Sequence, residues 1–165
     1  MLVKDLIDRT IELLGIEASK TDRLLLLNSY NLIETELALD YLPLTKSEVI
    51  QMKDSKIYYS DFSKMPIRVK GVFVAPQVSA KYHLFPEYIS VISAANSAVV
   101  DYSYIPDKKK EGDVSDYADS CRLLFEYGIC SEYCLQIGDY EQASIWHSHY
   151  SRQISSVLTT KKYQR

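Results

Sequence analysis

The chain has 165 residues, enough for one domain or a domain with a small insertion, and its 47% hydrophobic and 25% charged residues are typical of soluble globular proteins. A formal net charge of -3 argues against a general nucleic-acid-binding protein, which normally carries a basic excess. No apolar run approaches the roughly 20 residues of a membrane span and the N-terminus lacks a signal-peptide pattern, so we expect a soluble, intracellular protein.

Two amphipathic helices are predicted before residue 43. The first spans residues 2–14, because its apolar side chains recur on one face, and Gly15 ends it. The second is capped by Thr21 or Asp22 and continues until Pro43 closes it. Its apolar stripe, at steps of three and four, consists of Leu26, Tyr30, Ile33, Leu37 and Tyr41.

Residues 57–105 show the two-residue period of β-strands. In one expected strand, four residues share the face that points inward: Ile67, Val69, Gly71 and Phe73. Residues 94–97 are predicted to form the turn of a hairpin between strands 88–93 and 98–105. The second of these strands should present Val100, Tyr102 and Tyr104 on one face. Four or five short strands would form a small β-sandwich or curled sheet.

A charged loop at residues 107–113 separates the strands from two further helices. Its three lysines are largely cancelled by neighbouring acids, which indicates a solvated loop. Ser115 or Asp116 is expected to cap a long helix that reaches about Ile137, and Gly138 stops this helix in the left-handed conformation.

A final helix begins at Asp139, with Gln142 in the position of a capping box. One face of this helix carries Ala143, Trp146, Tyr150, Ile154 and Val157. The pattern as a whole predicts an α+β fold. A bundle of about four helices, formed by residues 1–43 and 107–165 and ending in a helix hairpin, would carry an inserted β module at residues 44–106.

The last two predicted helices are rich in aromatic residues, small residues and cysteines. This composition indicates that the two helices pack against each other. Gly128 inside a helix costs about 1 kcal/mol relative to alanine. Either another helix approaches closely there, with the ring of Trp146 or Tyr30, or the glycine is incidental. The predicted packing set is Tyr127, Gly128, Cys130, Cys134, Gly138, Asp139, Trp146 and Tyr150. The 14 tyrosines indicate either a tyrosine-rich core or an oligomer interface.

A zinc site is the first chemical possibility, because Cys130 and Cys134 lie one helical turn apart and two histidines follow. However, His147 and His149 are about 200° apart around a helix, so both cannot face one ion. We therefore expect buried, apolar thiols in a reducing compartment, with the histidines near the surface, and no bound metal.

No pattern in the chain indicates catalysis. The cysteines lie among apolar residues, and no nucleophile elbow, phosphate loop or dinucleotide fingerprint occurs. The carboxylate pairs Glu34 with Glu36 and Asp116 with Asp119 are expected on solvated helix surfaces. We expect no catalytic residue and no cofactor.

Two resemblances bear on function. The corner at residues 138–143, followed by Trp146 and Tyr150, resembles the inter-helix turn of a tetratricopeptide repeat, although no 34-residue period occurs. It implies an alternative function, a monomeric helical-hairpin adaptor that binds a peptide or protein partner in the hairpin groove.

The second resemblance covers most of the chain. The order of its motifs resembles that of bacteriophage head–tail adaptor (connector) proteins of the neck. The motifs are the Lys4–Arg9 helix ending at Leu14–Gly15, the Asn28–Leu42 helix, an inserted β region, the Val100–Pro106 strand end and the Tyr127–Tyr150 helix hairpin.

This resemblance implies a non-enzymatic virion protein. It would form a ring, commonly of twelve subunits, between the portal protein and tail or other neck proteins, with DNA only as passing cargo in the channel and no membrane contact. It would lie in the virion neck, and in the host cytoplasm during assembly. The segment after Leu158 is expected to order on docking, with Tyr163 and Arg165 as candidate contacts for a partner.

Overall fold

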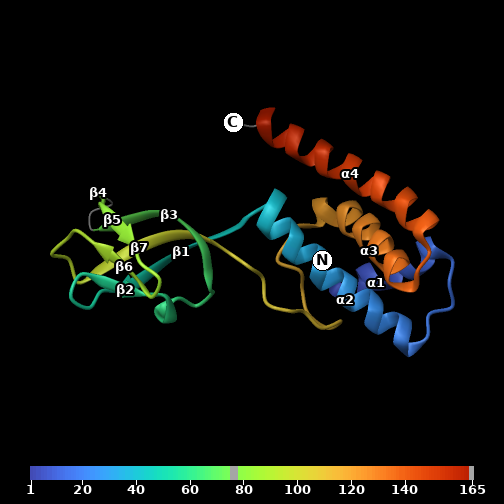
Figure 1. Cartoon of the computed structure of the whole chain (residues 1–165), viewed down its shortest axis with the longest axis horizontal. Coiled ribbons are helices and arrows are strands. Elements are labelled where there is room, and N and C mark those ends of the chain that lie inside the picture. The colour runs from blue at the N-terminus through green and yellow to red at the C-terminus, as the bar shows by residue number, and fades with distance from the viewer. Residues whose placement is uncertain (75–77, 164–165) are drawn as a thin grey trace. The chain divides into compact units, whose positions relative to one another are not determined.

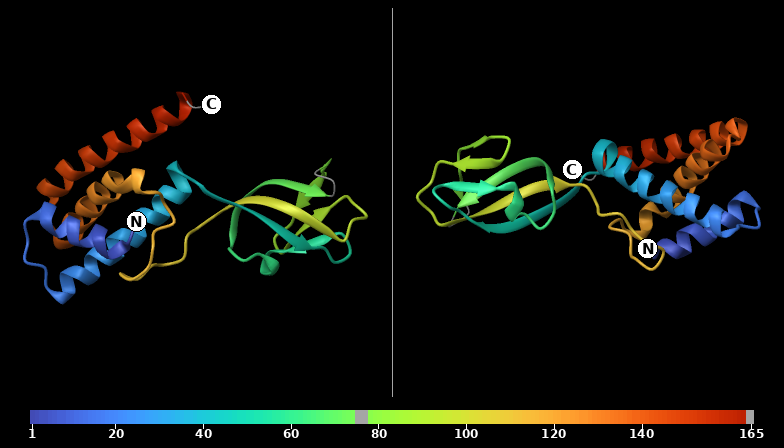
Figure 2. Two further views of the ribbon diagram at one scale, coloured as in Figure 1. Left: turned by 180° about the vertical axis from the view of Figure 1, so that it is seen from behind. Right: turned by 60° about the horizontal axis from the view of Figure 1, so that its bottom comes forward.

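The computed structural model describes residues 1–74 and 78–163, with only the backbone for residues 160–163. It confirms the predicted α+β class: α-helices occur together with two antiparallel sheets (Figure 1). The chain divides into two compact units, a helical unit of residues 1–41 and 107–165, and a β unit of residues 42–106. The chain passes between the units twice, and both connections can be followed in Figure 2.

The described part of the helical unit contains four α-helices and short turns of other helical types. The α-helices are α1 (Val3–Leu14), α2 (Lys20–Glu36), α3 (Arg122–Ile137) and α4 (Tyr140–Tyr163). A π-helical segment, Leu37–Tyr41, continues α2, and a 3-10 turn, Asp119–Cys121, precedes α3. Most of the predicted stripe lies in the core: Leu26, Tyr30 and Ile33 of α2 and Leu37 of the π-helical segment are buried. Tyr41, the last predicted residue, is only half-buried.

Glycines end two helices as predicted. Gly15 follows α1 with φ +64°, and Gly138 follows α3 with φ +82°. Both values lie in the left-handed region, which glycine enters without a steric penalty. Immediately after Gly138, Asp139 accepts a hydrogen bond from the backbone N–H of Gln142 at 3.1 Å, so a side-chain cap starts α4.

Two predicted helix starts are wrong. The cap of α2 is Ser19, not Thr21 or Asp22: the Ser19 hydroxyl accepts from the Asp22 N–H, and the Asp22 carboxylate accepts from the Ser19 N–H. Asp22 is therefore the second member of a capping box rather than the cap itself. Helix α3 starts at Arg122, well after Ser115, because the segment before it binds the side chain of another helix.

The described part of the β unit contains seven strands in two sheets, more than the four or five expected. They are β1 (Leu44–Gln51), β2 (Lys56–Tyr58), β3 (Pro66–Val74), β4 (Val78–Ser79), β5 (Tyr82–Leu84), β6 (Tyr88–Val91) and β7 (Ser97–Tyr104). The sheet orders are β1-β7-β3-β4 and β2-β6-β5, with antiparallel pairs throughout. The buried core of this unit consists of Ile50, Ile57, Phe62, Val72, Ile89, Val91, Ala98, Val100 and Tyr102.

The predicted hairpin around residues 94–97 is wrong. Strands β6 and β7 lie in different sheets, so the segment between them crosses from one sheet to the other. Both strands alternate as expected, but alternation within a strand does not identify its neighbour. Val100 and Tyr102 share the buried face of β7, as predicted.

The inward face predicted for β3 is also wrong. Val72 is fully buried, whereas Ile67 is 44% exposed. The register against β7 shifts between Pro66 and Arg68 and again between Val69 and Gly71. Such bulges change which side chains face the core, so a strict two-residue period fails here.

Strand β1 was not predicted, because the strand signal was placed from residue 57 onward. On its inner face two charged residues, Lys46 and Glu48, lie between the apolar Leu44 and Ile50. The Glu48 carboxylate accepts a hydrogen bond from Tyr102 at 2.7 Å. Lys46 binds the hydroxyl of Ser63. The inner face of β1 is thus held partly by hydrogen bonds to polar residues of the same unit. A search for alternating apolar residues does not detect such a strand.

Candidate functional site: the helix hairpin, a buried carboxylate and the exposed surfaces of the helical unit

The predicted packing residues of α3 and α4 divide into an inner and an outer group. Cys130, Cys134 and Tyr150 are buried, and burial raises the pKa of the Cys130 thiol to about 12. These thiols are therefore protonated, apolar core groups, as the sequence indicated, and not nucleophiles. The phenol oxygen of Tyr150 is also enclosed, and burial and the nearby Glu36 carboxylate raise the pKa of this phenol.

Gly128 is a point of close approach, which was one of the two interpretations of its place in a helix. A Cβ atom at this position would lie 3.0 Å from the Tyr150 ring and 3.1 Å from the Ile33 side chain. The predicted neighbours, Trp146 and Tyr30, are not the closest groups. Tyr30 instead stacks on Phe125, with the ring centroids 5.3 Å apart.

Tyr127 and Trp146 belong to the outer group. Their rings stack with centroids 5.9 Å apart, and the ring of the exposed His149 lies 5.4 Å from Tyr127. The three side chains form a partly exposed aromatic cluster on the hairpin. Gly138 and Asp139 form the corner between the helices, as described above. The side chain of Tyr163 and the whole of Arg165 lie outside the described residues.

Histidines and thiols do not meet in a metal site. His147 and His149 are exposed on α4, whereas Cys130 and Cys134 are buried on α3. Within residues 1–74 and 78–163, no three His, Cys, Asp or Glu side chains gather in a way that could hold a metal ion.

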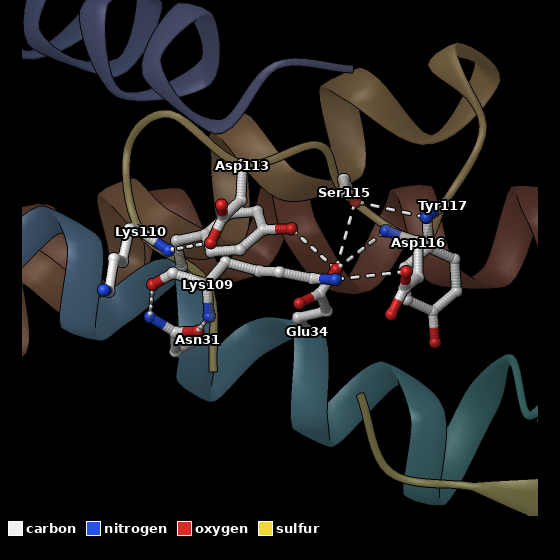
Figure 3. A network of polar contacts seen from close by, with 9 residues as sticks. Asn31, Glu34, Lys109, Lys110, Asp113, Ser115, Asp116 and Tyr117 are labelled. Atoms are coloured by element: carbon white, nitrogen blue, oxygen red, sulfur yellow. Dashed lines mark hydrogen bonds and ion pairs between the residues drawn. The ribbon is translucent and has the colours of Figure 1, made fainter. Parts of the chain in front are cut away.

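The most unusual polar group of the helical unit is Glu34 on α2, which is 1% exposed. The prediction of a solvated carboxylate is wrong for this residue. One of its oxygens accepts hydrogen bonds from Tyr30 Oη at 2.6 Å, Ser115 Oγ at 3.1 Å and the Asp116 N–H at 3.2 Å (Figure 3). These donors come from the same helix and from the segment that precedes α3.

Burial is the largest influence on the charge of Glu34, and it raises the pKa of the carboxyl above the ordinary value. The hydrogen bonds from Tyr30, Asp116 and Ser115 and the positive charge of Lys109 act in the opposite direction. Lys109 Nζ also lies 3.1 Å from the Asp116 carboxylate. The result is a closed polar network beneath the surface.

Most residues of the charged loop are exposed, as predicted, but the loop is also attached to the helices, which the sequence did not indicate. The Asn31 side chain donates to the Lys109 carbonyl at 3.1 Å and accepts from the Lys109 N–H at 2.6 Å (Figure 3). Arg23 donates two hydrogen bonds to the Glu111 carboxylate and also pairs with Asp8 at 2.8 Å. A two-point arginine–carboxylate contact fixes orientation as well as distance.

The backbone of α1 completes this attachment. The N–H of Val3 donates to the carbonyl of Asp113, and the N–H of Lys4 donates to the carbonyl of Glu111. The loop thereby accepts hydrogen bonds from the first turn of a helix, where backbone donors lack intrahelical partners. The loop, α1 and α2 form one structural element, in which the Glu34 network is the buried part.

A pH dependence follows from the raised pKa of Glu34. Between the ordinary value of 4.5 and its higher folded value, the folded chain binds more protons than the unfolded chain. The contribution of this group to stability is therefore present below pH 4.5 and is lost as the pH rises through the folded pKa. Glu34→Gln keeps a side-chain acceptor but does not ionise.

We expect the stability of the Glu34→Gln variant, relative to the wild type, to increase between pH 4.5 and pH 7.5, by at most about 1.4 kcal/mol per pH unit. Urea unfolding at several pH values measures this difference. Glu17→Gln, at an exposed position, is the matched control. A pH-independent difference between the wild type and Glu34→Gln would contradict the assignment.

The helical unit also carries two exposed apolar surfaces. The first, here called the α2 stripe, consists of Leu24, Leu32 and Leu39, which are 57%, 50% and 46% exposed. The second, the corner patch, surrounds the α3–α4 turn and consists of Leu135, Ile137 and Tyr140, which are 44%, 51% and 73% exposed. Sequence reasoning missed both. Of the two surfaces, only the α2 stripe could have been found in the sequence, because its leucines recur at helical spacing.

The comparisons with known proteins yield no relative: no family model matches the chain, and no curated protein matches it either. In the described part of the chain, every helix is too short or too polar to cross a lipid bilayer.

Proposed function

We propose that the protein is a non-enzymatic virion component that forms a ring in the neck of a bacteriophage, between the portal protein and the tail. The order of motifs along the chain supports this proposal, because it resembles that of head–tail adaptor proteins. DNA passes through such a ring as cargo, and the net charge of -3 suits a channel wall that does not grip it.

The observation that carries the proposal is the pair of exposed apolar surfaces on different elements of the helical unit. Neighbouring subunits of a ring make head-to-tail contacts, so each copy needs two different surfaces that fit one another. Exposed apolar side chains on two different elements are candidates for such surfaces.

The α2 stripe is well placed for such a contact. Leu24 and Leu32 lie about 80° apart around the helix. Leu24 is opposite the buried Leu26 and Ile33, and Leu32 lies about 100° from Ile33. The two faces of α2 thus differ in what they contact. One packs into the helical unit, and the other is available to the corner patch of the next copy.

The test is the mass of the chain by light scattering, alone and mixed with the portal protein encoded by the same genome. We expect an oligomeric ring, or an oligomer that assembles on the portal. Leu32→Asp should abolish the ring and the oligomer on the portal, because a carboxylate in the contact is left without a partner. Thr21→Asp, at an exposed position of the same helix, is the control and should assemble normally.

A strictly monomeric chain that ignores the portal protein would overturn the ring proposal. That result would favour the second candidate, a helical-hairpin adaptor. The cluster of Tyr127, Trp146 and His149 favours this alternative, because aromatic side chains with partly exposed faces are common in protein-binding surfaces.

A further inference from the structure

Strand β1 has an open edge. It is the terminal strand in the order β1-β7-β3-β4, and it pairs with β7 over eight consecutive residues without a register shift. Along an antiparallel strand, alternate residues direct their N–H and C=O groups away from the paired neighbour. Among the described residues, no backbone hydrogen bond satisfies the outward groups of residues 44–51.

The other long strand of this sheet has an edge with several features that discourage pairing. Strand β3 begins with Pro66, contains two register shifts against β7 and presents the exposed cations Arg68 and Lys70. Proline, bulges and charges are the usual means by which proteins prevent edge-to-edge association. Strand β1 has no proline and no bulge. It carries two charged residues on its inner face, Lys46 and Glu48, but these are of opposite sign and already bind Ser63 and Tyr102.

The sequence of β1 is complementary to itself when two copies run antiparallel. With Ser47 opposite Ser47 of a second copy, Lys46 meets Glu48, so opposite charges face each other. In the same register Thr45 meets Val49, a β-branched pair, and Leu44 meets Ile50, an apolar pair. Pairs of all three kinds stabilise antiparallel strands.

This register also satisfies the backbone. Each pair joins an even position to an even one or an odd position to an odd one, so residues with outward groups meet residues with outward groups. Val49 is 67% exposed on the outer face of β1, and Thr45 and Ser47 on the same face are exposed as well. Because these side chains are exposed, no other described segment covers the outer face of β1 where a second copy would pair.

We propose that two copies of this chain associate through antiparallel pairing of their β1 strands, centred on Ser47. The pairing joins the two four-stranded sheets into one continuous sheet across a two-fold axis. One strand pair is small compared with the roughly 1,600 Å² of a standard protein interface, so the dimer is weak and forms with rising concentration. The partner is a second copy because the charges and apolar residues of β1 match those of β1 itself.

Disulfide trapping of the full-length chain tests both the partner and the register. Ser47→Cys, Thr45→Cys and Val49→Cys are compared in a Cys121→Ser background, since Cys130 and Cys134 are buried. In the proposed register the two thiols introduced by Ser47→Cys lie directly opposite each other, within reach of a disulfide. Thr45 lies about 13 Å from its own counterpart, and so does Val49, which is too far for a disulfide.

The expected result is a disulfide-linked dimer for Ser47→Cys that forms about tenfold faster than for Thr45→Cys or Val49→Cys alone. An equimolar mixture of the Thr45→Cys and Val49→Cys chains should form the mixed dimer as fast as Ser47→Cys forms its own. Val49→Lys without added cysteine should abolish the rise of mass with concentration, because it places a lysine on the free edge.

Equal crosslinking rates for the three single variants, or a mixture no faster than its components, would overturn the proposal. The proposal does not depend on the ring. Strand β1 belongs to the β unit, whereas the surfaces assigned to the ring contact belong to the helical unit. Leu32→Asp should therefore abolish assembly with the portal protein and leave crosslinking through Ser47→Cys intact.

Discussion

Replacing Glu34 by leucine is expected to lower the free energy of unfolding by about 3 kcal/mol. The leucine fills much of the space but accepts no hydrogen bond. Tyr30 Oη, Ser115 Oγ and the Asp116 N–H then lose their acceptor in a buried region. Unfolding in urea, followed by the fluorescence of Trp146, measures the effect, because the only tryptophan of the chain lies on α4 in the helical unit.

A second substitution separates the lost hydrogen bonds from a change in shape. Tyr30→Phe removes one of the three donors but keeps the ring that stacks on Phe125. In the Glu34→Leu background, Tyr30→Phe also removes a hydroxyl that has lost its hydrogen-bond acceptor. The loss of unfolding free energy in the double variant should therefore be smaller than the sum of the losses in the single variants. Strictly additive costs would show that the Tyr30–Glu34 hydrogen bond contributes nothing to the stability of the network.

Replacing Gly128 by leucine is expected to destabilise the helical unit by about 3 kcal/mol. Even a single Cβ would lie 3.0 Å from Tyr150 and 3.1 Å from Ile33, so the rest of a leucine side chain has no room. The helices α2, α3 and α4 meet at this point, and the larger side chain must push them apart. The same urea titration measures the loss.

Two smaller substitutions serve as controls. Gly128→Ala combines a steric cost with a gain of about 1 kcal/mol in helix propensity, so its net effect should stay within about 1 kcal/mol. Gly112→Ala should be close to neutral, because nothing lies within 4 Å of a Cβ at that position. A leucine at position 128 that costs no more than the alanine would contradict the close approach of the helices.

The local structure of the helical unit follows from short stretches of sequence. Gly15 and Gly138 end their helices because a glycine, which has no Cβ, enters the left-handed conformation without a steric penalty. The buried stripe of α2 is also local, since helical spacing places Leu26, Tyr30 and Ile33 on one side. The α+β class follows from the change of period along the chain.

The candidate surfaces and the buried network were less predictable. Glu34 borders the apolar stripe, four residues after Tyr30 and three before Leu37, but helical spacing alone does not show that a carboxylate there is buried. The burial involves Ser115, which lies 81 positions away along the chain. Strands β6 and β7 alternate in the expected way, yet they belong to different sheets. The open edge of β1 is likewise invisible until the order of the strands is known.

Features whose causes lie within one helical turn or one strand could thus be predicted from the amino acids alone: the glycine stops, the cap at Asp139 and the buried face of α2. The contacts between distant segments became known from the folded chain: Glu34 with the loop, Gly128 with Ile33 and Tyr150, and β1 with one neighbour instead of two. Propensity and periodicity act between near neighbours, whereas burial and strand pairing depend on residues far apart along the chain.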